Sequence, residues 1–232
     1  MMPALRLILA IVLHTSALRA GGWLDEFWPE AKIYIKTSPT SRVFLQAART
    51  RTSENGFSEG QLGAHMDFYF SPFIKKDRPL RHPDVSRSKM IMLRAGYYFN
   101  RTPKDSPDPF TEHSGMIEVT PRFFLPKQIL VENRFRGDLR FLDGVFTPRF
   151  RDRLRIERPF KIPRTTLNPY AEVEVFYDWR YGSFHRQRYD AGVEWIAHPR
   201  FILEPYYLRQ HDSRSSNRWI DVAGVVLQFY FR

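Results

Sequence analysis

Two stretches in the second half of the chain alternate charged and apolar side chains. Residues 149–156 read RFRDRLRI, with an arginine at every second position, and residues 171–179 read AEVEVFYDW, with carboxylates at Glu172, Glu174 and Asp178. Successive side chains of a β-strand point to opposite faces, so each stretch would have one charged face and one apolar, aromatic face. This pattern predicts two strands in the wall of a β-barrel.

The alternation alone fits two kinds of barrel, because a soluble barrel would turn its charged face outward and a membrane barrel would turn it inward. Four further stretches, 62–70, 91–99, 189–195 and 223–231, carry apolar residues at every second position, with aromatic residues near their ends. Aromatic side chains collect at the two interfaces of a bilayer. We therefore predict an all-β fold, an antiparallel transmembrane up-and-down β-barrel; a soluble periplasmic barrel that binds an apolar ligand is the alternative.

Strand-like stretches recur from Ala31 to Phe231, and their connections alternate between short turns and longer polar loops. Bacterial barrels have even strand numbers as a rule, so we expect roughly 10 to 12 strands, with about 12 as the best estimate. The twelfth strand would come from Gly22–Trp28. One long connection, Ser71–Lys89, falls on the side of the short turns and is rich in lysine and arginine, which predicts a solvated basic loop.

The beginning of the chain has the features of a secretory signal peptide. Arg6 precedes an apolar core from Leu7 to Leu13, and Ala20 before Gly21 is a suitable cleavage point. We expect residues 1–20 to be a signal peptide and residues 21–232 to be a single outer-membrane β-barrel domain. The chain has no cysteine, which suits an exported protein of the Gram-negative periplasm or outer membrane.

Three motifs resemble those of a known family. They are RFRDRLRIERPF at residues 149–160, PYAE at residues 169–172 and EPYYLRQ at residues 204–210. Together they resemble an uncharacterised bacterial family of outer-membrane barrels, domain-of-unknown-function family 2490. The resemblance implies the fold and the compartment, and it implies no reaction because the family has no assigned one.

The inward positions of the predicted strands carry as many arginines as carboxylates, so the lumen is predicted to be charged but neutral overall. A turn centred near Pro163 would place Arg155 opposite Glu172, Arg153 opposite Glu174 and Arg149 opposite Asp178. A turn centred near Leu142 and Asp143 would bring Glu132 beside Arg153, the predicted centre of the network. The predicted lumen charge network comprises Glu132, Arg134, Arg136, Arg149, Arg151, Arg153, Arg155, Glu172, Glu174, Asp178, Arg186 and Arg188.

This network favours a salt-bridged, largely filled lumen with a structural role or a narrow passage for small solutes. An anion-selective pore would need a lumen of net positive charge, which the equal numbers disfavour.

An outer-membrane lipid-modifying enzyme is the competing class of function. Its candidate residues are His65, His185 and the run His211-Asp212-Ser213. Adjacent residues of an extended chain point in different directions, so Asp212 cannot orient His211 as a catalytic triad requires. A hydrogen-bonded lumen position is the expected role of His65. We therefore assign no catalytic residue, and without a metal-ligand cluster or nucleotide motif we expect no metal and no cofactor.

The expected partners are outer-membrane lipid and the barrel-assembly machinery. Despite a formal charge of +11, nucleic acid is not expected as a partner of an exported chain. The last residues, Phe229-Tyr230-Phe231-Arg232, are similar to the C-terminal signal of barrel proteins. Asn133 and Asp152 are polar at outward positions and, in the register above, directly opposite each other, which suggests a protein contact on that face.

Overall fold

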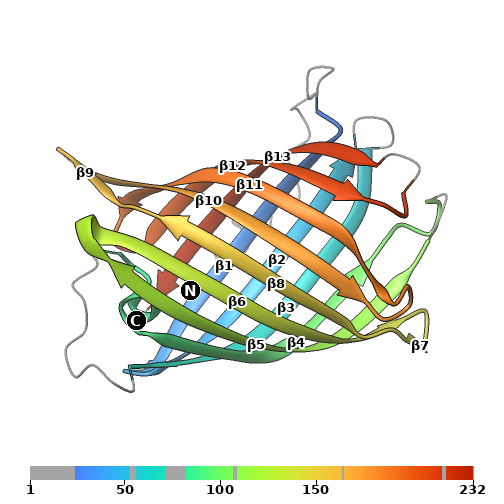
Figure 1. Cartoon of the computed structure of the whole chain (residues 1–232), viewed down its shortest axis with the longest axis horizontal. Helices are drawn as coiled ribbons and strands as arrows, with labels where there is room; N and C mark the ends of the chain where they lie inside the picture. The colour runs from blue at the N-terminus through green and yellow to red at the C-terminus, as the bar shows by residue number, and fades with distance from the viewer. Residues whose placement is uncertain are drawn as a thin grey trace.

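Eleven long strands form one closed barrel in the computed structural model of this chain (Figure 1). The structure describes residues 24–52, 56–71, 82–106, 109–163, 165–215 and 218–231, with the side chains of residues 56–58 excepted. The predicted signal peptide, residues 1–20, lies outside the described residues.

The strands and 3₁₀ helices follow one another along the chain without a second domain among the described residues. They are β1 Glu26–Ser38, β2 Ser41–Thr52, β3 Gly56–Phe70, η1 Val85–Ser88, β4 Ile91–Arg101, β5 Thr111–Leu125, η2 Pro126–Gln128, β6 Ile129–Leu142, β7 Val145–Phe146, β8 Arg149–Glu157, β9 Phe160–Ile162, β10 Thr165–Asp178, β11 Ser183–His198, β12 Phe201–Asp212 and β13 Trp219–Phe231. The short strands β7 and β9 extend the pairing of β6 and β10, and the other eleven form the wall. No helix in these parts of the chain is long and apolar enough to cross a membrane.

The barrel closes through a parallel pair of strands. Neighbouring strands are antiparallel all round the wall except that β1 pairs with β13 in parallel, from Glu26 opposite Val222 to Ile35 opposite Phe231. The all-β barrel is confirmed, and its wall of eleven strands lies within the predicted range, but the estimate of 12 and the expected even number are wrong. Residues 26–28 belong to β1 and add no separate strand. With an odd number, the first and last strands run in the same direction, and a parallel ladder is what satisfies their edge groups.

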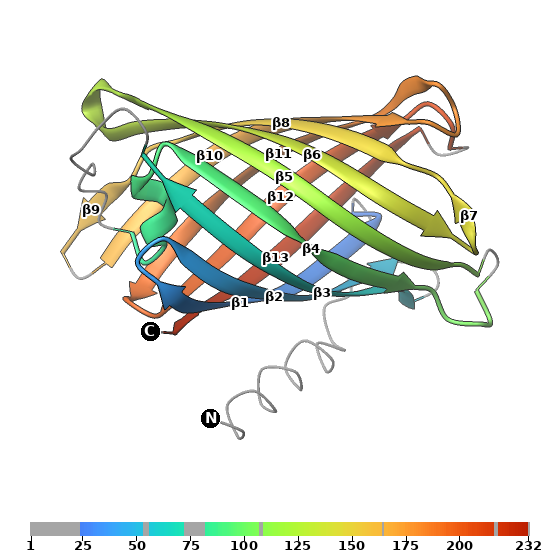
Figure 2. The same cartoon turned by 90° about the horizontal axis from the view of Figure 1, so that it is seen from below.

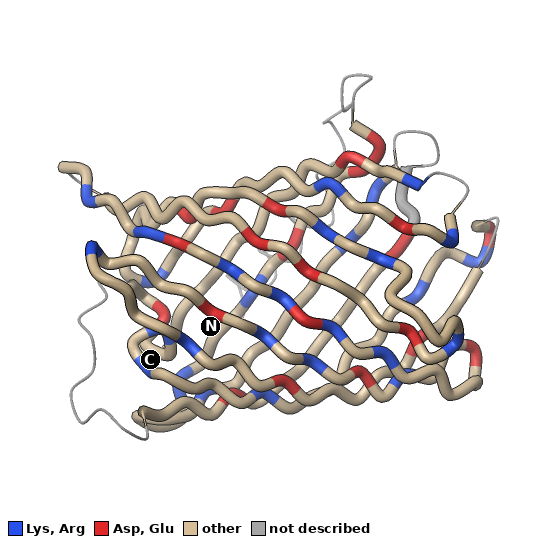
Figure 3. Tube along the Cα trace, viewed as in Figure 1, with Lys and Arg blue, Asp and Glu red and all other residues tan. Residues whose placement is uncertain are grey.

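The charged side chains of the wall point into the barrel, and the apolar side chains point outward. Large apolar side chains such as Ile117 (62% exposed) and Leu62 (59%) face outward, whereas Asp67 and Glu194 are fully buried inside. Lysine, arginine and acidic positions recur along every part of the wall (Figure 3). This distribution is the reverse of that in a soluble barrel, and it is typical of barrels whose outer face contacts lipid.

The two rims differ in their connections. The rim that we call the short-turn rim contains the β1–β2 turn, the β11–β12 turn, η2 and the end of β13. The rim that we call the loop rim contains the start of β1, the turn at Asp143–Gly144 and the turn at residues 179–182. The two rims lie at opposite ends of the barrel, near β9 and β7 respectively (Figure 2).

The connection between β3 and β4 folds into the barrel at the short-turn rim. Its described part, residues 82–90, is called the plug below; it contains η1, which lies within the barrel at that end (Figure 2). Ser86 is fully buried and Asp84 is 7% exposed. The predicted solvated basic loop is therefore wrong for residues 82–89, because the plug's polar groups find partners on the charged inner wall; residues 72–81 lie outside the described part.

Candidate functional site

The lumen holds a polar cavity of about 850 Å³ on the loop-rim side of the plug. Its lining extends from Leu142 and Asp143 near the loop rim to Asp84 and Arg87 of the plug. A second cavity of about 320 Å³ lies on the other side, lined by Pro83 and Val85 of the plug together with residues of the short-turn rim. Within the described residues, the plug therefore lies between the two cavities, and Tyr34 and Arg42 line both of them.

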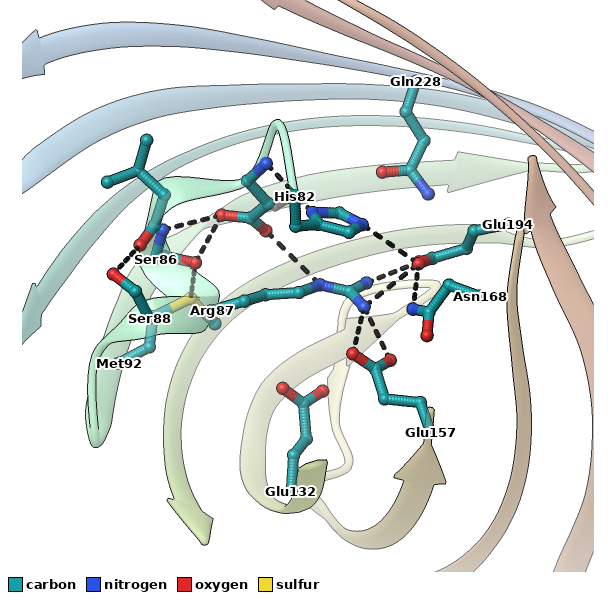
Figure 4. A network of polar contacts seen from close by, with 12 residues as sticks. His82, Ser86, Arg87, Ser88, Met92, Glu132, Glu157, Asn168, Glu194 and Gln228 are labelled. Carbon is teal, nitrogen blue, oxygen red and sulfur yellow. Dashed lines mark hydrogen bonds and ion pairs between the residues drawn. The ribbon is translucent and has the colours of Figure 1, made fainter. Parts of the chain in front are cut away.

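Arg87 fastens the plug to the far wall. Its Nη1 donates to both carboxylate oxygens of Glu157 at 2.6 Å, and its Nη2 donates to Glu194 Oε1 at 2.5 Å (Figure 4). The Glu194 carboxylate also accepts hydrogen bonds from Arg155 Nη2 at 3.0 Å and from Asn168 Nδ2 at 2.7 Å. Glu194 is thus the point where β8, β10 and the plug meet on β11.

His82 adds a second plug contact to the same carboxylate. Its Nε2 lies 3.1 Å from Glu194 Oε2, and its Nδ1 accepts a hydrogen bond from the Asp84 backbone N–H at 3.0 Å (Figure 4). Because Nδ1 is the acceptor, Nε2 carries the proton and donates to Glu194.

Asp84 fastens the plug to the opposite side of the wall. Its Oδ1 accepts from Arg42 Nη1 at 2.5 Å, and it also caps η1 by accepting from the Ser86 backbone N–H at 2.9 Å. Arg42 in turn binds Asp67 at 2.6 Å, and Asp67 binds Arg94 at 2.5 Å. The chain of charges continues from the plug across β2, β3 and β4.

A third contact comes from β5. Arg122 Nη1 donates to the Ser86 carbonyl oxygen at 2.6 Å while its Nε binds Glu132 at 2.8 Å. The plug is therefore tied to the wall in three directions by charge-assisted hydrogen bonds, which are stronger than those between neutral groups.

The surrounding charges keep Asp84 and Arg87 of the plug charged. Burial acts to raise the pKa of the Asp84 carboxyl, but Arg42, followed by Arg87, outweighs it and holds that pKa well below its usual range. Burial acts to lower the pKa of the Arg87 guanidinium, but Glu157 and Glu194 outweigh it and raise that pKa well above its usual value. An unpaired charge at either position would be costly.

The predicted register between β8 and β10 is confirmed. Arg155 lies opposite Glu172, Arg153 opposite Glu174 and Arg149 opposite Asp178. Arg155 binds Glu172 directly across, at 3.5 Å, but two other ion pairs run diagonally. Glu174 accepts two hydrogen bonds from Arg151 at 2.9 Å, and Arg153 binds Glu172 at 3.3 Å.

Asp178 departs from the predicted pairing in another way. It binds Arg140 at 2.5 Å and Arg180 at 3.1 Å instead of Arg149. Opposite register does define other ion pairs of the lumen, such as Arg122 with Glu132 and Arg149 with Asp138. For Glu174 and Asp178 it does not, since arginine side chains also reach the neighbouring row.

The predicted register between β6 and β8 is wrong by two residues. Glu132 lies opposite Arg155, and Arg134 lies opposite Arg153. The hairpin turn is centred between Asp143 and Gly144, which have φ of 49° and 83°, and not between Leu142 and Asp143. An Asp-Gly pair with two positive φ values is the sequence that a two-residue type I′ turn favours.

The corrected register has two consequences for the predicted pairs. Arg153 binds Glu132 at 3.3 Å and therefore lies between two carboxylates, as predicted. Its second partner is Glu172, and not Glu174. Asn133 is opposite Leu154, and Asp152 is opposite Phe135, so the two polar outward residues are diagonal neighbours and not directly opposite.

The structure brings the predicted lumen network together. All of its residues except Asp178 line the main cavity; Asp178 is 1% exposed and lies behind Arg140. Sequence reasoning missed the plug contacts, above all Arg87 with Glu157 and Glu194. Two features of the sequence could have indicated these contacts. Glu157 and Glu194 are at inward positions, and the basic connection 71–89 is long although it falls on the side of the short turns.

The candidate catalytic residues lie in different surroundings. Asp212 binds Arg186 at 2.7 Å, whereas His211 packs on the ring of Trp219 with 4.6 Å between centroids. Ser213 Oγ donates to the His185 carbonyl oxygen at 3.3 Å. Asp212 therefore serves the lumen and does not orient His211, as the sequence predicted.

His65 is buried in the wall of the lumen. Its ring stacks on Phe44 with 5.1 Å between centroids and lies between Gly63 and Gly96. Neither ring nitrogen has a hydrogen-bond partner among the described residues, so the expected hydrogen-bonded role is wrong and the role is one of packing. No cluster of three or more His, Asp or Glu side chains suited to a metal occurs in the described ranges.

Comparison with known proteins identifies the family of this chain and a similar solved structure. No curated protein matches the chain. Among solved structures, the β domain of the Bordetella autotransporter Brka is similar to it, with a TM-score of 0.42, 15% sequence identity, and coverage of 80% of this chain and 81% of that one. The family indicated by the sequence motifs is confirmed over residues 26–221, and the chain belongs to the family described as Protein of unknown function (DUF2490).

Proposed function

We propose that this protein is a β-barrel of the Gram-negative outer membrane, with a lumen closed by its own plug and a narrow passage for small polar solutes as its role. The membrane location is supported by the outward faces, where Phe123 (57% exposed) and Leu154 (55%) stand among many exposed apolar side chains. In water this surface would promote aggregation, whereas in a bilayer it contacts lipid. Closure of the wall leaves no unpaired strand edge in the hydrocarbon layer.

The location is tested by fractionation of cells that express the full chain. We expect the protein in the outer-membrane fraction and, in mild detergent, a faster gel migration before heating than after it. A soluble periplasmic barrel would be recovered in the periplasmic fraction, and that result would reject the membrane proposal. The partners of this protein would be outer-membrane lipid and the barrel-assembly machinery. We propose no lipid-modifying activity, because His211 and Asp212 lie in different surroundings.

The contact between Arg87 and Glu194 carries the closed-passage proposal. It joins the plug to β11 inside the barrel, and the plug lies between the two cavities. A solute that moves through the lumen would have to displace the plug. Because the plug is held by ion pairs and hydrogen bonds and not by an apolar core, such a displacement would exchange polar partners for water or solute.

Planar-bilayer recording tests the closure. We expect the intact protein to show little or no stable conductance and Arg87→Ala to show more frequent and larger openings. In that variant Glu157 loses its partner on the plug and Glu194 keeps only His82. The matched control is Arg209→Ala, which removes an arginine that is 53% exposed on the outer face of β12. Large, steady conductance from the intact protein, or identical recordings from the two variants, would reject the closed passage.

A further inference from the structure

Four arginines surround one aromatic ring in the half of the lumen nearer the loop rim. The guanidinium carbons of Arg149, Arg151, Arg186 and Arg188 lie 5.8, 4.6, 5.8 and 4.9 Å from the centroid of the Phe176 ring. The arginines come from β8 and β11, and Phe176 comes from β10 between them. All five side chains line the main cavity. We call these five residues the arginine cluster.

The arginine cluster has too few carboxylates to be neutral. Its arginines bind Asp138, Glu174 and Asp212, but Asp138 is shared with Arg136 and Glu174 is shared with Arg134. Five guanidiniums therefore share three carboxylates, and Arg188 binds none of the three. Arg134 has one further, longer contact of 3.9 Å with Glu118. Counted over these ion pairs, the cluster and its two neighbouring arginines have more guanidiniums than carboxylates.

Arg188 is the member without a carboxylate partner. Its Nε donates to the neutral side chain of Gln210 at 2.7 Å, and its guanidinium also lies 4.8 Å from the Trp28 ring. Glu26 of β1 and Glu59 of β3 act on it electrostatically, but neither forms an ion pair with it among the described residues. An aromatic ring attracts a cation without cancelling its charge, so the positive potential remains.

The strand register adds to the repulsion. Arg136 lies opposite Arg151, and Arg134 lies opposite Arg153, on the neighbouring strands β6 and β8. Like charges directly opposite each other in a sheet are destabilising. Glu174, which binds both Arg134 and Arg151, offsets part of this repulsion, and a bound anion would offset more of it.

We propose that the arginine cluster binds a small phosphate-type oxyanion that enters the lumen from the loop rim. Guanidinium groups match the geometry of phosphate oxygens and donate several hydrogen bonds to them. Arg188 is the residue with donors to spare, and the carboxylate partners of Arg149, Arg151 and Arg186 hold those side chains in place around the site. This site does not depend on the closed passage, because it lies on the loop-rim side of the plug.

Equilibrium binding to the full chain in detergent micelles tests the site. Titration with inorganic phosphate, followed by calorimetry and by the rise in unfolding temperature, should show saturable binding to the intact protein. Arg188→Gln should weaken phosphate affinity about tenfold or more, since it removes the guanidinium without a carboxylate partner. Arg188→Lys keeps the charge but loses the planar guanidinium. Its phosphate affinity should lie between those of the intact protein and Arg188→Gln.

The control variant is Arg209→Gln, on the outer face of the barrel, which should bind phosphate like the intact protein. Heat-modifiable migration confirms the fold of each variant before titration, and phosphate binding by a folded Arg188→Lys with intermediate affinity would also support the site. No binding by the intact protein, or equal affinity in Arg188→Gln, would overturn it. Stabilisation by phosphatidic acid in mixed micelles but not by the free ion would assign the phosphate to a lipid headgroup and overturn the solute site. None of these results depends on bilayer conductance or membrane fractionation.

Discussion

Arg87 Nη2 and Glu194 Oε1 are 2.5 Å apart although the two residues are separated by 107 positions in the chain. The pair joins a connection between two strands to the opposite wall of the barrel. Since Glu194 also holds Arg155 and Asn168, the same carboxylate fixes the plug and the local packing of three wall strands. The plug and the wall therefore form one continuous polar network.

The contact of the plug with β2 predicts a defined pH dependence. Because the pKa of Asp84 in the folded protein is held below the ordinary value of about 3.9, its carboxylate stabilises the fold at pH values above that range, and this contribution is lost as the pH falls through the lower folded value. Asp84→Asn should lower the free energy of unfolding at neutral pH by about 1–3 kcal/mol.

The measurement is denaturant unfolding in detergent from pH 7 down to about pH 2. The difference in the free energy of unfolding between the intact protein and Asp84→Asn should become smaller as the solution is acidified below about pH 4. Asp105→Asn, in the connection between β4 and β5, is the control. A difference that stays constant over the whole range would show that Asp84 does not contribute through its charge.

Diagonal ion pairing predicts which residues are coupled in the lumen. Glu174 makes two hydrogen bonds to Arg151 but lies opposite Arg153. A double-mutant cycle with Arg151→Ala and Glu174→Ala should give a coupling energy of about 1.5–3 kcal/mol. The same cycle with Arg153→Ala and Glu174→Ala should give a smaller value, and the opposite order would show that register, not the diagonal contact, defines the pair.

The packing of His65 predicts that Gly96 does not tolerate a side chain. A Cβ at Gly96 would lie 2.4 Å from His65 Nδ1 and 2.5 Å from the Ala64 carbonyl oxygen. Gly96→Ala should destabilise the barrel by about 1–3 kcal/mol or reduce its assembly. A Cβ at Gly115 of the neighbouring strand β5 would have no atom within 4 Å, so Gly115→Ala is the matched control. Equal unfolding midpoints for the two variants would contradict the close packing.

The polar pair on the outer face predicts a protein contact. Asn133 Oδ1 and Asp152 Oδ1 are buried and have no hydrogen-bond partner among the described residues, although both side chains are on the outward face. We expect the double variant Asn133→Leu and Asp152→Leu to reduce the mass of the detergent-extracted protein if the two residues join it to another protein. Light scattering coupled to gel filtration gives that mass, and an unchanged value would eliminate the contact.

The sequence predicted the pairing of β8 and β10 correctly but not that of β6 and β8. Pairing in a hairpin depends on the centre of the turn, and a shift of the centre by one residue moves the register by two. The Asp143-Gly144 pair was the local signal for the correct centre. Placement of ion pairs was less predictable than register, because an arginine side chain chooses among several carboxylates within its reach.

The alternation of charged and apolar residues by itself determined the barrel, the charged interior and the apolar exterior, since the two faces of a strand are a local property of the chain. The odd strand number, the plug and the uneven pairing of the lumen arginines were decided only in the tertiary structure. Closure depends on how the first and last strands meet, and the plug depends on contacts such as Arg87 with Glu194 that span the whole barrel. The sum of lumen charges can be counted from the sequence, but their local balance depends on which side chains share a carboxylate in space.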